Sequence, residues 1–216
     1  MIKINYEKRW DNLRSSLGEK DAFVAALPGN TRYLANSESP PGTPPSSTMN
    51  YVVIPKKSEP FAITSSLEEH RCRHESSVKD IRCWTTYPDI KSDGKSALEI
   101  LKSSLKEIKA KQIFTDTKVS LGRSFKVSVS SNVNELRSIK SKAELQRIKK
   151  AIKQSDAGQM FAHNLVESGE GLSEKEVRSE IDYFMARKGI QENSFSTIVA
   201  SGPNSAHSHH SNTDRK

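Results

Sequence analysis

Cysteine and long apolar runs are scarce in this sequence, and both shortages exclude whole classes of protein. Cys72 and Cys83 are the only cysteines among 216 residues, too few for the disulfide framework of a small secreted domain. No run approaches the roughly 20 apolar residues that a membrane-spanning helix requires. Residues 1–10 carry charges throughout and lack the apolar core of a signal peptide. We therefore expect a protein of the reducing cytoplasm that has no membrane partner.

Hydrophobic residues are also few, at 34% of the chain, against roughly 45–50% in an ordinary globular domain. The net charge of +8 permits binding to a nucleic acid or another anionic surface. However, the basic stretch 137–153 contains no aromatic residue that would stack on bases. We interpret this stretch as a solvated helix face, and we do not expect a nucleic-acid partner.

The apolar pattern of the first 125 residues predicts alternating helices and strands, which is typical of an α/β domain. Helices are expected over residues 6–17 and 98–108, and a capping box of Ser66 and Glu69 predicts another over 67–76. Pro28-Gly29-Asn30 predicts a turn. Short apolar runs predict strands at residues 22–27, 51–54, 61–64, 81–87 and 112–115, with 51–54 and 61–64 forming a hairpin.

The Pro-rich stretch 39–47, within the first part of the chain, predicts an irregular loop or a lid. The composition changes later, where the polar stretch 128–134 predicts a linker. A capping box, Ser141 with Glu144, opens a helix that is expected to reach residue 166. A further box, Ser173 with Glu176, opens a helix that Gly189 ends. An apolar, β-branched run predicts a strand at 195–200.

Familiar catalytic and metal-binding patterns are mostly missing. The sequence contains no Gly-x-Ser-x-Gly nucleophile motif and no Walker-type Gly-rich loop. His70 and His74 would share a helix face as zinc ligands do, but Cys72 between them would point elsewhere. A polar helix surface is therefore the preferred interpretation of this pair.

A cluster of His207, His209 and His210 follows the Gly202-Pro203-Asn204 turn. On an extended chain, His207 and His209 project to one face and His210 to the other. Two imidazoles on one face are suited to ligate a metal, and one imidazole is suited to act as an acid or base near neutral pH. A polar surface loop is an equally good interpretation of the spacing alone.

Several blocks, taken together and in order, resemble one known family. They are residues 136–145, Ala151, residues 173–177, 194–202 and 204–209. Their order and spacing resemble the creatinase/prolidase/Xaa-Pro aminopeptidase group, the M24-type pita-bread hydrolases. The upstream half, with residues 30–34 and the hairpin ending at 61–64, is similar to that family's smaller N-terminal domain.

The resemblance implies an α/β fold with two parts. Residues 1–130 would be a creatinase-like N-terminal domain, a mixed sheet with helices. Residues 131–216 would be a linker helix and the incomplete start of a pita-bread catalytic domain. By this resemblance, the complete protein would use two divalent metal ions, such as Mn, Co or Zn, to cleave peptide bonds beside proline. It would also form homodimers through the small domain.

The resemblance also implies roles for residues. The family's Gly-x-Asn-x-Ala-x-x-His pattern falls on Gly202, Asn204, Ala206 and His209, so His209 is the expected catalytic residue, contacting the substrate and the developing tetrahedral species. His207 and His210 are expected to bind substrate beside it. The family's metal ligands (two aspartates, a histidine and two glutamates) lie downstream of this motif, and Asp214 lies too close to the motif to be one of them. We therefore expect a fragment that holds no metal and is inactive.

Two alternatives remain open at this point. Some pita-bread relatives are non-catalytic and bind proteins or other partners, and the +8 charge would suit an acidic or nucleic-acid partner. A creatinase-like hydrolase, in contrast, would use the histidine without metals.

Overall fold

The structure of the chain is a computed structural model that describes residues 2–36, 50–169 and 171–216. It consists of two compact units: Lys3–Lys140, here called the first unit, and Ser141–Lys216 with Ile2, here called the second unit. The stretch 39–47, predicted as an irregular loop or lid, lies outside the described residues. None of the helices in the described part of the chain has the length and apolarity that crossing a bilayer would require.

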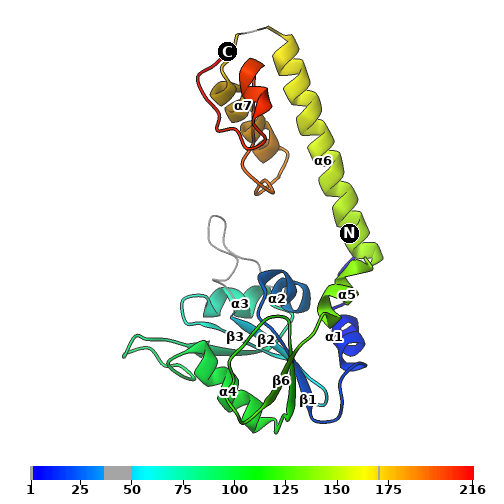
Figure 1. The fold of residues 1–216 in the computed structure, drawn as a ribbon, viewed down its shortest axis with the longest axis vertical. Helices are drawn as coiled ribbons and strands as arrows, with labels where there is room; N and C mark the ends of the chain where they lie inside the picture. Colours follow the sequence, from blue (N-terminus) through cyan, green and yellow to red (C-terminus); the bar gives the residue numbers. More distant parts are fainter. Residues whose placement is uncertain (1, 37–49, 170) are drawn as a thin grey trace. The chain divides into compact units, whose positions relative to one another are not determined.

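The first unit is built on one six-stranded sheet (Figure 1). Its strands are β1 (Asp21–Ala25), β2 (Tyr51–Pro55), β3 (Phe61–Ser65), β4 (Asp80–Trp84), β5 (Gln112–Thr115) and β6 (Lys126–Val129). They lie in the order β4-β3-β2-β1-β5-β6. The β1/β2 and β2/β3 pairs are antiparallel, which confirms the predicted hairpin. The other neighbours are parallel, so the sheet is mixed.

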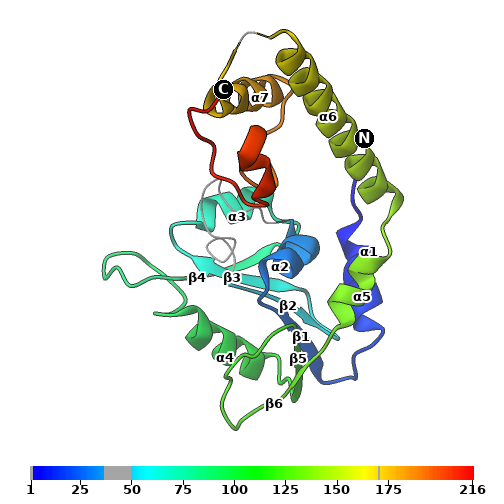
Figure 2. The same cartoon turned by 45° about the horizontal axis from the view of Figure 1, so that its top comes forward.

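Helices cover both faces of this sheet (Figure 2). Side chains of β1 alternate between the two cores, as strand geometry requires: Phe23 packs with one cluster and Val24 with the other. The helix on the Val24 side is α4 (Ala97–Glu107), which contributes Leu101 and Leu105. The helices on the Phe23 side are α1 (Tyr6–Arg14), α2 (Pro28–Ala35), α3 (Glu69–Glu75) and α5 (Asn132–Ser138).

The turn predicted at Pro28-Gly29-Asn30 is wrong, because Pro28 opens α2 instead of ending β1. Proline suits the first turn of a helix, where its missing N–H costs nothing. Leu27, at the N-cap, makes no side-chain cap. Asp116, which follows β5, binds the chain just before the helix: its carboxylate accepts from the backbone N–H groups of Ala26 and Leu27, at 2.9 and 3.0 Å.

Two further expectations for the first unit are wrong. Ser66 does not cap α3, which begins at Glu69 after an N-cap residue, Glu68, that has no side-chain hydrogen bond. Residues 128–134 are not a linker, since the end of β6 and the start of α5 occupy them. Val133 in α5 is 1% exposed and belongs to the core cluster on the Phe23 side of the sheet, so this polar stretch is packed against the core.

The second unit consists of two long helices and an irregular C-terminal segment. The helices α6 (Lys142–Glu167) and α7 (Glu174–Arg187) both begin with the predicted capping boxes. Phe161 of α6 and Phe184 of α7 stack with ring centroids 4.3 Å apart. Gly189 follows α7 with φ of +80°, a conformation that suits glycine. A short 3₁₀ helix, η2 (Gly202–Ala206), lies in the C-terminal segment.

The strand predicted at residues 195–200 is wrong, because the described residues contain no strand in this segment. Two of its backbone groups bind one side chain instead. The N–H of Val199 donates to Oδ1 of Asn212 at 3.3 Å, and the carbonyl of Thr197 accepts from Nδ2 of the same amide at 3.2 Å. Asn212 therefore takes the place that a neighbouring strand would have.

Candidate functional site: the histidine loop

The three clustered histidines lie on the segment 201–213, here called the histidine loop. The loop begins with η2, where Pro203 sits in the first turn. His207 and His209 are exposed. The side chain of His210 is only 10% exposed. The chain thus presents two imidazoles to solvent and turns the third inward.

The buried partner of His210 is Glu174, the first residue of α7. Its side chain is 1% exposed, and Nε2 of His210 lies 2.7 Å from Oε2. The same oxygen accepts from the backbone N–H and the hydroxyl of Thr213, at 2.9 and 2.8 Å. A carboxylate this deeply buried is stable only when its oxygens are fully hydrogen-bonded.

The second oxygen of Glu174 binds the opposite end of the loop. Oε1 accepts from the backbone N–H of Ser201 at 2.7 Å and from its hydroxyl at 3.0 Å. It also accepts from Nδ2 of Asn204 at 2.9 Å. One carboxylate therefore takes six hydrogen bonds, three from the start of the histidine loop and three from its end.

These contacts determine the ionisation of Glu174. Burial raises the pKa of the carboxyl, but the hydrogen bonds from Asn204, His210, Ser201 and Thr213 lower it by more. The pKa of Glu174 therefore lies well below its usual range, and the group stays ionised under ordinary conditions. Its position at a helix N-terminus also favours negative charge.

The backbone at the start of α7 makes two further hydrogen bonds, one to the last residue of the histidine loop and one just beyond it. The N–H of Glu174 donates to the carbonyl of Arg215 at 2.9 Å, and the N–H of Lys175 donates to that of Thr213 at 3.2 Å. These are two of the N–H groups that a helix leaves without partners in its first turn. Lys175 also forms an exposed ion pair with Asp214 at 3.0 Å.

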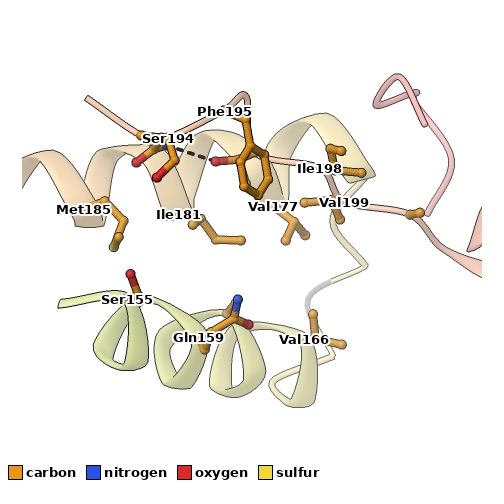
Figure 3. A pocket seen from close by; sticks show the side chains of 15 residues that line it. Ser155, Gln159, Val166, Val177, Ile181, Met185, Ser194, Phe195, Ile198 and Val199 are labelled. Atoms are coloured by element: carbon orange, nitrogen blue, oxygen red, sulfur yellow. Dashed lines mark hydrogen bonds between the residues drawn. The ribbon is translucent and has the colours of Figure 1, made fainter. Parts of the chain in front are cut away.

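A pocket of about 470 Å³ lies within the second unit, between α6, α7 and residues 193–200 (Figure 3). Figure 3 shows Val177, Ile181 and Met185 of α7 turned toward α6, with Phe195 beside them. Most of the side chains that line it are apolar, and none of the three clustered histidines is among them. The pocket therefore offers apolar contact but no acid–base group.

Other candidate groups give no second site. His70 and His74 lie exposed on α3, while Cys72 between them is buried. Burial raises the pKa of the Cys83 thiol to about 12, and it also raises that of Cys72, so neither is a ready nucleophile. Across residues 2–36, 50–169 and 171–216, no group of three or more His, Cys, Asp or Glu side chains is arranged to hold a metal ion.

Sequence reasoning selected the histidines but missed Glu174. An acidic residue after the N-cap of a helix is ordinarily a solvated partner of the helix dipole, so its type and place gave no sign of burial. The available signal was that residues 173–177 and 204–209 belong to the same set of ordered blocks. The structure explains this association, since Glu174 binds Asn204 directly.

Comparison with known sequences finds a family match within the second unit. Residues 146–216 match the model of metallopeptidase family M24. An Xaa-Pro dipeptidase of Pyrococcus furiosus is 37% identical over 84 residues, which are 39% of this chain and 24% of that protein. A putative dipeptidase of Bacillus subtilis, YkvY, is 36% identical over 117 residues, which are 52% of this chain and 29% of that protein. The matched stretches thus span about a quarter of these curated relatives.

Comparison with solved structures extends the likeness in fold to the whole chain. An Xaa-Pro dipeptidase from Bacillus anthracis has a TM-score of 0.73 at 23% identity, covering 98% of this chain and 57% of that one. A prolidase from Thermococcus sibiricus has a TM-score of 0.73 at 25% identity, covering 100% of this chain and 59% of that one. The predicted α/β fold class is confirmed, and this chain spans a little over half of each of those structures.

Proposed function

We propose that this chain, which belongs to the creatinase/prolidase group of metallopeptidase family M24, is the amino-terminal part of an Xaa-Pro dipeptidase-like hydrolase. The observation that carries the proposal is the place of the family match: residues 146–216 include the entire histidine loop. The relatives named as Xaa-Pro dipeptidases support a substrate with proline after the scissile bond.

His209 is the proposed catalytic residue of the complete protein. Its imidazole is exposed on the histidine loop and is free to contact a peptide. A ring N–H aimed at the scissile carbonyl would stabilise the negative charge that develops on its oxygen during attack. His207, which is also exposed, is a proposed substrate contact. For His210 the bond to Glu174 favours a supporting role over direct contact with the peptide.

Membership in family M24 is consistent with the use of divalent metal ions in the full-length proteins. The potential metal ligands among the described residues do not fit such a centre. Glu174 and His210, the buried carboxylate–imidazole pair, already bind each other, and six donors surround the carboxylate. We therefore propose that the metal ligands (the two aspartates, the histidine and the two glutamates of the family) belong to sequence that is not part of this chain. The 216-residue chain alone should be inactive.

The proposal also covers the domain organisation, the cellular setting and the oligomeric state. The chain would comprise a creatinase-like N-terminal domain, residues 1–130, and the beginning of a pita-bread domain, residues 131–216. Its two compact units support a two-domain organisation. Cys72 and Cys83 are both buried as thiols, which supports a reducing, cytoplasmic setting. A homodimer through the small domain is proposed from the family alone.

The experiment that tests the proposal begins with the gene. The next ~150 encoded residues, a typical domain length, should contain the five-ligand set, and their absence from the complete gene would sink the metallopeptidase assignment. In the protein expressed from that longer frame, His209→Ala should slow hydrolysis of an Xaa-Pro dipeptide by about 10²–10³-fold. The matched control is His163→Ala, since His163 is an exposed histidine of α6, outside the histidine loop, that pairs with Glu167 at 3.4 Å. It should leave the rate unchanged.

A further inference from the structure

We propose that Glu174 is the positioning residue of the histidine loop: by binding both ends of the loop, it fixes where His209 lies. The role of His209 rests on the proposed function, whereas the attachment of the loop to Glu174 does not. Glu174 lies at the start of α7, away from the histidines in sequence, and it would act on a substrate only through the loop.

The geometry of attachment carries the inference. Ser201 and Asn204 bind Oε1, and His210 and Thr213 bind Oε2. The two oxygens of a carboxylate are about 2.2 Å apart by ordinary covalent geometry, so the two ends of the loop are held close together. Between Asn204 and His210 only five residues remain, and His209 is directly bonded to one of the attached positions.

One long bond crosses the loop itself, from Nδ2 of Asn204 to Oγ1 of Thr213 at 3.4 Å, and the backbone bonds inside the loop are local. The N–H of Asn204 donates to the carbonyl of Ser201, and the N–H of His207 donates to that of Asn204. Each closes a single turn of η2. A short 3₁₀ helix has poor hydrogen-bond geometry, so a lasting position for the exposed histidines requires an anchor outside the loop.

Only a carboxylate satisfies all six donors. A glutamine side chain of the same shape has one acceptor oxygen, and its NH₂ group can only donate. Hydroxyls and the imidazole of His210 can accept from that NH₂ group, but a backbone N–H cannot. In a Glu174→Gln variant either the N–H of Ser201 or the N–H of Thr213 therefore faces a donor and loses its partner.

Glu176 provides a matched control two residues away. It lies in the same first turn of α7, and hydrogen bonds from Ser173 also lower its pKa. Its carboxylate accepts from the N–H and the hydroxyl of Ser173, at 2.7 and 2.8 Å. Both of these contacts are inside the capping box, outside the histidine loop. A Glu176→Gln variant therefore perturbs the helix start without touching the loop's anchor.

The test uses the 216-residue chain and two readouts. Amide hydrogen exchange of residues 201–213 should quicken by about tenfold or more in Glu174→Gln, because the loop loses one hydrogen bond to a charged acceptor. It should stay unchanged in Glu176→Gln. In the ¹⁵N spectrum of labelled histidines, the signals of His209 and His210 should shift in Glu174→Gln. The signal of His163 should not move.

Equal exchange in wild type and Glu174→Gln would overturn the inference, and so would equal quickening in both glutamine variants. If Glu174→Gln fails to fold, Asn204→Ala removes one donor while leaving the carboxylate in place, and it should quicken exchange of the loop selectively. These outcomes are independent of peptide hydrolysis. A failure of the proposed peptidase activity would leave the exchange result standing, and a failure of the exchange result would leave the family assignment standing.

Discussion

Nε2 of His210 lies 2.7 Å from Oε2 of Glu174, and the two residues are 36 positions apart in the chain. The pair connects the first residue of α7 to the C-terminal segment. The histidine loop is polar and has one short 3₁₀ helix. It keeps a defined conformation because donors from both of its ends bind one buried, charged acceptor, the carboxylate of Glu174.

The pH dependence of stability should carry the signature of this carboxylate. Hydrogen bonding holds the pKa of Glu174 well below its usual range. At low pH the Glu174 carboxyl is therefore protonated in the unfolded state but still ionised in the folded state. The free energy of unfolding consequently falls as pH falls. The stabilisation should be fully present above about pH 5 and should decline below the unfolded Glu value of about 4.3.

Urea unfolding of wild type and Glu174→Gln between pH 7 and pH 3 measures this effect. The difference in the free energy of unfolding between the two proteins should be largest at pH 7 and should shrink toward pH 3. A difference that is constant or grows in acid would show that the carboxylate does not contribute through its charge.

The capping box of α7 should matter more than the exposed hydroxyls of the same helix. Ser173 is 6% exposed and both donates to and accepts from Glu176. Ser173→Ala should lower the free energy of unfolding of the second unit by about 1 kcal/mol. Ser179→Ala, at an exposed interior position of α7, should be neutral or slightly stabilising because alanine favours helix. Denaturant titration of both variants checks the contrast, and equal losses would argue against the cap.

A comparable role belongs to Asp116 in the first unit. It accepts from Ala26, Leu27 and Nδ2 of Asn30, and so links the end of β5 to the start of α2. Asp116→Ala removes a charged acceptor from three donors, so it should lower the free energy of unfolding by about 2 kcal/mol. Urea unfolding measures this change. Asp89→Ala, at an exposed position after β4, serves as control. An Asp116→Ala protein as stable as this control would contradict the role.

In the longer protein of the proposed function, Glu174 and His209 should act as one unit. Glu174→Gln should lower kcat more than it raises KM, because it displaces a group that acts in the transition state. The double variant Glu174→Gln/His209→Ala should be no slower than His209→Ala alone. Additive losses in steady-state kinetics would show that Glu174 supports the protein by another route.

Periodic apolar patterns predicted most of the fold correctly. The stripe of Tyr6, Trp10 and Leu13 specified α1 because a helix with one apolar face has a single way to bury it. The failures have local causes. Pro28 suits a turn and a helix start equally well, and the bond of Asn30 in this helix to Asp116, 86 positions away, cannot be read from the local sequence.

The candidate site was predictable only in part. The resemblance singled out His209 from its motif, but the spacing of the histidines alone left metal binding, acid–base chemistry and a bare surface loop all open. Glu174 escaped because its burial depends on donors 27 to 39 positions downstream. The run at 195–200 looked like a strand because β-branched residues favour one, yet the backbone groups of Thr197 and Val199 bind the side chain of Asn212.

The most direct test of the account compares two lengths of the protein in one assay: hydrolysis of an Xaa-Pro dipeptide with Mn²⁺ or Co²⁺ added. The 216-residue chain should show no turnover above background, whereas the protein continued through the downstream reading frame should show metal-dependent turnover that a chelator abolishes. Turnover by the 216-residue chain alone, or a longer protein that carries the five ligands and remains inactive with every metal, would contradict the account.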